Sequence, residues 1–219
     1  MRIRNKPWAT KELNLCPYFI REPESHKGSW HTLFKKEQPL YIELGCGKGF
    51  FIAGAAVQNP GINFLGIDIK DAVLGPAKRN IDAAFTAVNG EPSNVILTAF
   101  NVELMLNYMG PADAADRIYI NFCNPWPKKK HQKRRLTYPR QLENYKVILK
   151  PGGKIFFKTD DDSLFEDSIG YFNSCGFKIT YKTYDLHAEK AIPGIMTEHE
   201  IMFTEKGIKI KALTAEFKP

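Results

Sequence analysis

Apolar runs of strand length alternate with segments of helical period along most of this chain of 219 residues. In the segments between the runs, apolar residues recur three and four positions apart, as they do on one face of a helix. Strands that alternate with helices form a mostly parallel sheet with helices on both faces. The sequence therefore predicts an α/β fold with a mostly parallel, seven-stranded sheet. The predicted strands are residues 40–44, 62–67, 95–100, 117–122, 154–159, 177–184 and a last strand that begins at 200–204.

The segments between these strands predict five helices, at residues 50–58, 71–88, 102–108, 138–149 and 163–174. Gly75 and Pro76 interrupt the second helix near its start, because proline lacks the backbone N–H that a helix interior uses. We expect that helix to begin late or to bend. Residues 192–199 are predicted to form a loop.

Residues 1–37 precede the alternating pattern and are polar and irregular. We interpret them as an amino-terminal arm that is partly disordered when free. The arm either orders on a partner or packs on the domain formed by residues 38–219. A chain of this length is expected to form one α/β domain with such an appendage.

Composition argues against several classes of protein. No apolar run approaches the roughly 18 residues of a membrane-spanning helix, and the first residues lack the apolar core of a signal peptide. We therefore expect no membrane partner and a cytoplasmic location. The four cysteines are widely spaced and lack histidine partners, which favours reduced thiols over disulfides and predicts no metal site. They are Cys16, Cys46, Cys123 and Cys175.

The chain carries 31 lysines and arginines against 24 aspartates and glutamates, and its net charge is +7. Part of the excess lies between Lys128 and Arg135, where six of eight residues are cationic. A basic run is often only a solvated surface. Its position directly after a predicted strand, where open α/β sheets bind their ligands, favours a loop that binds the phosphates of a nucleic acid.

The segment Asn124-Pro125-Trp126-Pro127 joins the predicted strand at 117–122 to the basic run. Two prolines one residue apart make this backbone stiff and extended. A polar side chain and an aromatic ring at the end of a strand, followed by cations, predict a base-sized pocket beside the phosphate-binding loop.

Polar residues also lie at the ends of the other predicted strands: Glu43, Asp68, Asn101 and Asp160. The carboxyl ends of parallel strands meet at one edge of a sheet, and α/β sheets of this kind bind their ligands there. We therefore predict that these four residues and Asn124 share one binding edge.

Three glycines, Gly45, Gly47 and Gly49, follow the first predicted strand. A glycine loop between a strand and a helix lets the backbone approach a nucleotide closely. An acid at the end of the next strand, here Asp68, binds ribose hydroxyls in such sites. The loop therefore predicts a nucleotide-like cofactor.

The spacing of the glycines discriminates between cofactors. The dinucleotide fingerprint requires a third glycine where this chain has Phe50. Lys48 is followed by glycine instead of serine or threonine, which disfavours the phosphate loop of an ATPase. The spacing found, Glu43-x-Gly45-x-Gly47-x-Gly49, is typical of S-adenosylmethionine-dependent methyltransferases.

Four stretches and the opening MRIRNKPW resemble the tRNA (guanine-N(7))-methyltransferase family, and its bacterial members in particular. The stretches are IELGCGKGFF at 42–51, NPWPKKKHQKRRLT at 124–137, FKTD at 157–160 and TEHE at 197–200. The resemblance covers nearly the whole chain and implies a Rossmann-like class I methyltransferase fold. It also implies methyl transfer from S-adenosylmethionine to ring nitrogen 7 of a guanine in the tRNA variable loop, by a monomer or homodimer.

The resemblance further implies a role for individual residues. The implied cofactor-binding residues are Glu43, Gly45, Gly47, Gly49, Asp68, Asn101 and Asn124. The implied substrate-binding residues are Lys128, Asp160, Thr197 and Glu200, and the implied catalytic residues are Asn124 and Asp160. The implied contacts to tRNA phosphates are Lys129, Lys130, Lys133, Arg134 and Arg135.

One departure from the family concerns catalysis, because members usually carry aspartate where this chain has Asn124. Ring nitrogen 7 of guanine has a lone pair and no proton, so transfer needs no general base and depends on alignment and charge. Asparagine can orient the base but supplies no charge, so we expect a slower enzyme instead of an inactive one. Asp160 or Glu200 could supply the missing negative charge. Asn101 also stands where an acid is frequent.

Two alternatives stay open. Asn124-Pro125-Trp126 is similar to the Asn-Pro-Pro-aromatic signature of amino-group methyltransferases, whose asparagine accepts a hydrogen bond from an exocyclic amine. The protein could instead bind tRNA without transferring a methyl group, if Asn124 has removed catalysis.

Overall fold

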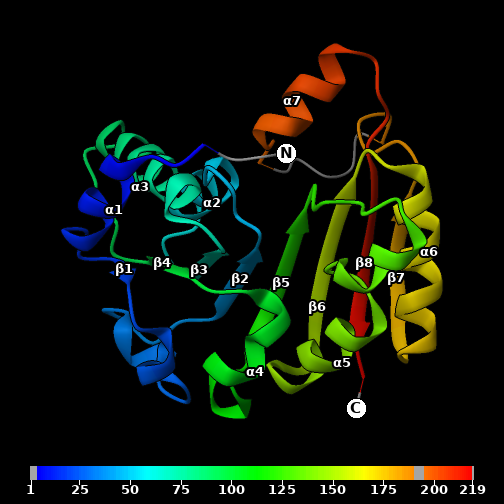
Figure 1. The fold of residues 1–219 in the computed structure, drawn as a ribbon, viewed down its shortest axis with the longest axis horizontal. Helices are drawn as coiled ribbons and strands as arrows, with labels where there is room; N and C mark the ends of the chain where they lie inside the picture. Colours follow the sequence, from blue (N-terminus) through cyan, green and yellow to red (C-terminus); the bar gives the residue numbers. More distant parts are fainter. Residues whose placement is uncertain (1–3, 190–194, 219) are drawn as a thin grey trace. The chain divides into compact units, whose positions relative to one another are not determined.

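The structure, a computed structural model, describes residues 4–189 and 195–218. The chain divides into two compact units, Met1–Asp113 and Ala114–Pro219. The described residues contain eight strands, four in each unit, and seven α-helices (Figure 1). The predicted α/β fold class is confirmed.

The first unit contains four parallel strands in the order β1-β4-β3-β2. β2 (Leu40–Leu44), β3 (Asn63–Asp68) and β4 (Val95–Ala99) are the first three strands that the sequence predicts. The sequence pattern does not predict β1 (Phe19–Ile20), which lies in the arm and pairs with β4. β1 therefore raises the number of strands in the described residues from the predicted seven to eight.

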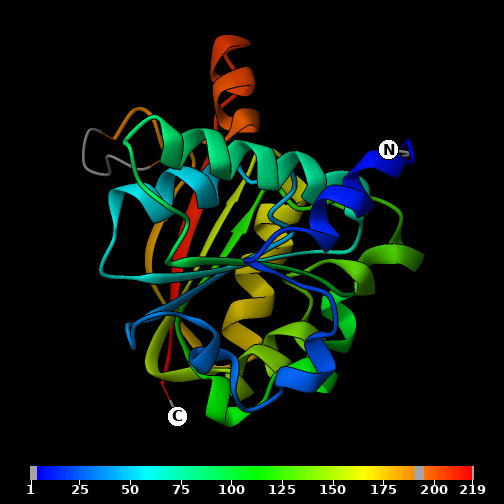
Figure 2. The same cartoon turned by 90° about the vertical axis from the view of Figure 1, so that its left-hand side faces the viewer.

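The α-helices and the 3-10 helices of the arm lie on opposite sides of these strands. α2 and α3 lie on one side, and the 3-10 helices η1 and η2 of the arm lie on the other (Figure 2). The helices of this unit are α1 (Pro7–Asn14), α2 (Phe50–Gln58), α3 (Asp71–Thr86) and α4 (Met105–Tyr108), with η1 (Pro23–His26), η2 (Trp30–Leu33), η3 (Val102–Leu104) and η4 (Pro111–Asp113).

α3 begins at Asp71 and continues through Gly75 and Pro76, so it does not begin late. Gly75 has a different role in the structure. A Cβ atom at this position would lie 2.4 Å from the Cβ of Ala9 on α1. The glycine therefore allows α1 to pack closely beside α3, as Figure 2 shows.

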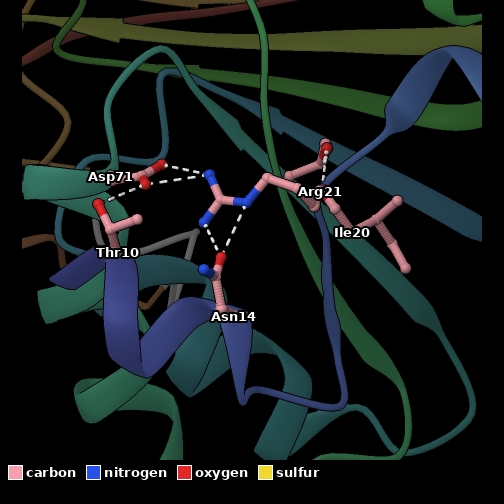
Figure 3. Close-up of polar contacts among 6 residues, drawn as sticks. Thr10, Asn14, Ile20, Arg21 and Asp71 are labelled. Atoms are coloured by element: carbon pink, nitrogen blue, oxygen red, sulfur yellow. Dashed lines mark hydrogen bonds and ion pairs between the residues drawn. The ribbon is translucent and has the colours of Figure 1, made fainter.

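Polar contacts also join the arm to α3 (Figure 3). The guanidinium of Arg21 donates to both carboxylate oxygens of Asp71 at 3.0 Å and to Oδ1 of Asn14. Thr10 on α1 donates to the same Asp71 carboxylate at 2.8 Å. In this structure the described part of the arm packs on the first unit through a helix, a strand and this cluster.

The second unit also contains four strands, in the order β5-β6-β8-β7. β5 and β6 are parallel, whereas β8 is antiparallel to both of its neighbours. α6 packs on β7 and β8, and α7 extends past the carboxyl ends of β5 and β6 (Figure 1). The elements are β5 (Ala115–Asn121), η5 (Lys129–Arg134), α5 (Pro139–Val147), β6 (Leu149–Thr159), α6 (Asp162–Ser174), β7 (Phe177–Thr183), α7 (Glu198–Glu205) and β8 (Lys211–Phe217).

The prediction that a strand begins at 200–204 is wrong, because these residues belong to α7. The side chain of Thr197 accepts a hydrogen bond from the backbone of Glu200, and Glu200 accepts one from the backbone of Thr197. This capping box starts a helix and outweighs the short apolar run that follows it. The last strand comes later, as β8. Of the loop predicted at 192–199, residues 192–194 lie outside the described residues.

Each unit buries side chains between its strands and its helices. In the first unit, Ile42, Leu65 and Ile67 of the strands are fully buried, as are Ile52 and Ile81 of the helices. In the second, the fully buried residues include Ile118, Ile155, Phe157, Leu142 and Phe165. Within residues 4–189 and 195–218, no helix is long and apolar enough to cross a membrane.

Candidate active site

The glycine loop between β2 and α2 has a backbone that only glycine adopts readily. Gly45, Gly47 and Gly49 have positive φ angles of 72°, 56° and 72°. The backbone N–H groups of Gly45 and Cys46 both donate to the carbonyl of Ile67 on β3, at 2.8 and 3.0 Å. The loop therefore turns sharply at the end of its strand and lies against the neighbouring strand.

Asp68, the last residue of β3, holds the glycine loop in place. Its carboxylate accepts hydrogen bonds from the backbone N–H of Gly47 at 3.0 Å and from that of Ile69 at 2.7 Å. Burial raises the pKa of this carboxyl group, and the backbone N–H bonds act in the opposite direction. Asp68 is half-buried, so one carboxylate both orders the loop and lies at the edge of the sheet.

The other residues predicted to bind the cofactor lie at the same edge. β2, β3 and β4 are adjacent and parallel, so their carboxyl ends coincide. Glu43 is buried near the end of β2. Asn101 follows β4 and accepts a hydrogen bond from the backbone of Glu103. The first unit therefore brings Glu43, the glycine loop, Asp68 and Asn101 to one edge, as the strand-end pattern predicts.

In the second unit, the chain leaves β5 through a strained corner, residues 122–127. Phe122 and Trp126 have positive φ angles of 52° and 42°, which bulky side chains rarely adopt. The backbone N–H of Trp126 donates to Oδ1 of Asn124 at 3.0 Å. The carbonyl of Pro125 accepts a hydrogen bond from Nε of Arg135 at 2.7 Å. The two prolines predict an extended backbone, but the corner is bent. The side chains of Asn124 and Arg135 hold it in that form.

The basic run that follows forms the 3-10 helix η5. Lys128, Lys129, Lys130, Lys133 and Arg134 are all exposed. The guanidinium of Arg134 lies 5.1 Å from the ring centroid of Trp126, within the range of a cation–π contact. His131 lies 5.8 Å from the same ring. The tryptophan therefore packs against the basic helix and helps to order it.

Arg135 differs from its neighbours, because its side chain is only 1% exposed. One guanidinium nitrogen lies 2.5 Å from a carboxylate oxygen of Asp167 on α6. This position argues against the phosphate contact that the sequence predicts for Arg135. The run of basic residues gave no sign of the difference, because the partner of Arg135 lies 32 residues further along the chain.

Asp160 directly follows β6, beside the end of β5. The two acids after it have structural partners: Asp161 caps α6 through the backbone N–H of Leu164, and Asp162 pairs with Lys211. Within the part of the chain that the structure describes, the carboxylate of Asp160 forms no such bond, and only its backbone carbonyl is engaged, by Lys211. Asp160 is therefore the acid of this trio that remains available to a ligand.

Thr197 and Glu200 are buried at the start of α7. Besides the capping box, Glu200 pairs with Lys158 of β6 at 3.1 Å and lies 3.5 Å from Nε2 of His187. The charge of Glu200 is thus balanced by Lys158, which lowers its value as a source of negative charge for a substrate. Sequence reasoning did not assign roles to Lys158 and His187. The FKTD stretch contains Lys158, but its partner Glu200 is remote in sequence.

Comparison with known proteins decides the family. A family model described as "Putative methyltransferase" matches residues 37–213. The chain is 55% identical over 215 residues to the tRNA (guanine-N(7)-)-methyltransferase of Clostridium beijerinckii, which covers 98% of each chain. It is 48% identical over 218 residues to the protein of the same name from Acetivibrio thermocellus, which covers 100% of each. The chain belongs to the tRNA (guanine-N(7)-)-methyltransferase family.

Solved structures agree with the fold of this methyltransferase family. The 16S rRNA methyltransferase KamB matches 99% of this chain and 95% of its own, with a TM-score of 0.61 and 15% identity. A methyltransferase from Pyrococcus furiosus matches 86% of this chain and 79% of its own, with a TM-score of 0.55 and 16% identity. At such identity the likeness concerns the fold alone, which is the Rossmann-like fold of class I methyltransferases.

Among the described residues, no three His, Cys, Asp or Glu side chains cluster as metal ligands would. The four cysteines are free thiols.

Proposed function

We propose that this chain methylates ring nitrogen 7 of a guanine in tRNA, with S-adenosylmethionine as the methyl donor. The observation that carries the proposal is full-length identity of 44–55% to proteins named tRNA (guanine-N(7)-)-methyltransferase. The arrangement of polar residues at the strand ends supports it. A tRNA substrate would also place the protein in the cytoplasm.

The residues at the edge of the first unit fit the cofactor. Carboxylates suit ribose hydroxyls, and Asp68 is half-buried at the strand end where such a contact is made. The glycine loop presents backbone without side chains beside it. We propose that Glu43, Gly45, Gly47, Gly49, Asp68 and Asn101 hold S-adenosylmethionine, which supplies a methyl group on a positively charged sulfur.

Chemistry at the guanine requires alignment more than proton transfer. Ring nitrogen 7 attacks through its own lone pair, so no residue of this chain has to remove a proton. Positive charge develops on the ring, and the Asp160 carboxylate, which has no other partner in the described residues, could stabilise it. Asn124 is exposed, and its amide could orient the base while its oxygen also holds Trp126.

The exposed cations of η5 and Lys128 suit the phosphates of tRNA. Such contacts give affinity and register but do not read sequence. We propose that Lys128, which directly follows the corner and is exposed, contacts the substrate. We propose that Lys129, Lys130, Lys133 and Arg134 contact phosphates. Thr197 and Glu200 would act on the substrate pocket indirectly, by fixing α7.

The test is incubation of the protein with unmodified tRNA and labelled S-adenosylmethionine, followed by nucleoside analysis. We expect the label in 7-methylguanosine. Label on an exocyclic amine would favour an amino-group methyltransferase, and binding without transfer would favour a tRNA-binding protein.

Asn124→Asp sharpens this test. The aspartate keeps the oxygen that holds Trp126 and adds a negative charge near the ring. We expect kcat to rise by about tenfold or more, since one contact to a charged group contributes on the order of 1.5–3 kcal/mol and about 1.4 kcal/mol corresponds to a factor of ten. Steady-state kinetics at saturating tRNA measures the effect, and a fall in kcat would show that the charge is unfavourable here.

A further inference from the structure

The peptide unit between Pro125 and Trp126 is held from both sides. Its carbonyl accepts a hydrogen bond from Nε of Arg135 at 2.7 Å, and its N–H donates to Oδ1 of Asn124 at 3.0 Å. Both contacts act on one rigid plane. The orientation of the Asn124 side chain is therefore linked, through that plane, to the position of Arg135.

The conformation that these contacts hold is unfavourable in itself. Trp126 has a φ angle of 42°, in a region that costs a bulky residue conformational energy. Such a residue persists only where its surroundings impose the conformation. Within the described residues, the contacts imposed on this peptide unit come from Asn124 and Arg135, so loss of either should let the corner relax.

Arg135 is anchored in its turn. Its guanidinium is buried and pairs with Asp167 of α6, and the hydroxyl of Thr137 lies 2.7 Å from that of Ser168 on the same helix. The segment that ends the basic run is therefore fixed to α6 at two points. Arginine suits this position because its planar group donates in two fixed directions at once, which a lysine ammonium does not reproduce.

We propose that Arg135 is a positioning residue for methyl transfer: it holds the corner in the bent form that orients Asn124, and it does not contact tRNA. The proposal rests on the proposed function, because it takes Asn124 as a residue that meets the guanine. Arg134 and Arg135 are adjacent and chemically identical, yet one is exposed over Trp126 and the other is buried beneath the corner.

The matched pair of Arg134 and Arg135 variants tests the proposal. Arg135→Lys keeps the charge but loses the two-directional donor, so we expect kcat to fall about tenfold or more while KM for tRNA changes little. Arg134→Gln should instead flatten the dependence of log affinity for tRNA on log salt by about 0.7–0.9, the contribution of one phosphate contact. Arg135→Gln should leave that slope unchanged. Two results would overturn the proposal. One is a salt dependence of tRNA affinity that is flattened as much in Arg135→Gln as in Arg134→Gln, and the other is an unchanged kcat in Arg135→Lys.

A second readout does not require activity. Cys123, next to Asn124, is partly exposed; burial raises the pKa of its thiol to about 12, and the thiol also interacts with the backbone of Leu136. Relaxation of the corner should expose the thiol further, so Arg135→Lys should speed alkylation of Cys123 several-fold, as followed by peptide mass spectrometry. Cys46, the buried thiol of the glycine loop, is the internal control and should react at its wild-type rate.

The two readouts separate the inference from the function on which it rests. Wild-type protein that transfers no methyl group, with Cys123 still more reactive in Arg135→Lys, would reject the function and keep Arg135 as the support of the corner. An active wild type whose kcat and Cys123 reactivity are both unchanged in Arg135→Lys would reject the inference alone. Asp167→Asn weakens the same support from the other side and should give smaller changes in the same directions, which covers the case in which Arg135→Lys folds poorly.

Discussion

The glycine loop of the first unit and the corner of the second unit both turn the chain sharply at the end of a strand, but with different residues. Each begins at the carboxyl end of a parallel strand, and each contains residues with positive φ angles. The loop uses glycines, for which this conformation has no steric cost. The corner uses Phe122 and Trp126, for which it costs roughly 1–3 kcal/mol each, and Asn124 and Arg135 hold it.

The glycine loop and the corner differ in the contacts that fix their shape. The shape of the glycine loop needs the absence of side chains and acceptors on the neighbouring strand β3, which are the Asp68 carboxylate and the Ile67 carbonyl. The shape of the corner depends on Arg135 and, through it, on Asp167 of α6. Substitutions should therefore damage the loop by adding atoms and the corner by removing hydrogen-bond donors.

The largest effect is expected from Gly49→Ala. The new Cβ would lie 2.8 Å from the Cβ of Ala77 on α3, and the φ angle of 72° disfavours any side chain. Overpacking and backbone strain together should lower the free energy of unfolding by about 2–4 kcal/mol. Denaturant unfolding measures it. Gly61→Ala is the matched control, because its Cβ would meet no atom within 4 Å; equal losses in both variants would contradict the account.

Asp68→Asn should weaken binding of S-adenosylmethionine about 10–100-fold. The substitution removes the charge that is proposed to bind the ribose and one of the two carboxylate oxygens that accept the N–H groups of Gly47 and Ile69. Calorimetric titration of the cofactor measures the loss. Asp68 is not proposed to contact tRNA, so affinity for tRNA should stay within about twofold of wild type. A comparable loss of both affinities would mean that the loop also takes part in binding tRNA.

The pH dependence of the same variant gives an independent check. Burial raises the pKa of Asp68 above its usual value of 3.8, so the folded state binds this proton more tightly than the unfolded state. The contribution of this carboxyl group to the free energy of unfolding is therefore largest below pH 3.8. It decreases as the pH rises from 3.8 through the raised pKa. The difference in unfolding free energy between wild type and Asp68→Asn should decrease over that window, and an increase would reverse the assigned direction.

Removal of charge from the basic helix η5 should act on tRNA alone. Replacing Lys129, Lys130 and Arg134 by glutamine should reduce affinity for tRNA about tenfold or more at moderate salt and lower the salt slope by about 2–3. Binding of S-adenosylmethionine should be unchanged. Fluorescence titrations at several salt concentrations measure the slope, and an unchanged slope would remove these residues from the RNA interface.

The smallest effect is expected at the start of α7. Thr197→Val removes the hydroxyl of the capping box, which typically contributes about 1 kcal/mol. Hydrogen exchange of the α7 amides should become about fivefold faster. Thr204→Val on the same helix is the control, because within the described residues the Thr204 hydroxyl bonds the carbonyl of Glu200 and takes no part in the cap. Equal exchange in both variants would show that the cap does not hold the helix.

Local patterns predict the glycine loop and most of the strands, because periodicity and loop spacing depend on neighbours in sequence. β1 escapes prediction because two residues carry no period, and it is defined by pairing with β4. The interpretation of 200–204 as a strand rests on the apolar run at 201–203 and does not consider that Thr197 and Glu200 can form a capping box, which the structure shows at the start of α7. The burial of Arg135 and the pair formed by Lys158 and Glu200 depend on partners remote in sequence, which no local pattern reveals.

Hydrogen exchange at one backbone amide tests the comparison most directly. Trp126 has the only backbone N–H between Asn124 and Lys128, because both of its neighbours are prolines, and that N–H donates to Asn124. Its exchange in wild type and Arg135→Lys can be compared with that of the Gly47 N–H, which donates to Asp68. We predict faster exchange at Trp126 in Arg135→Lys and an unchanged rate at Gly47. An unchanged rate at Trp126 would contradict the claim that Arg135 holds the corner.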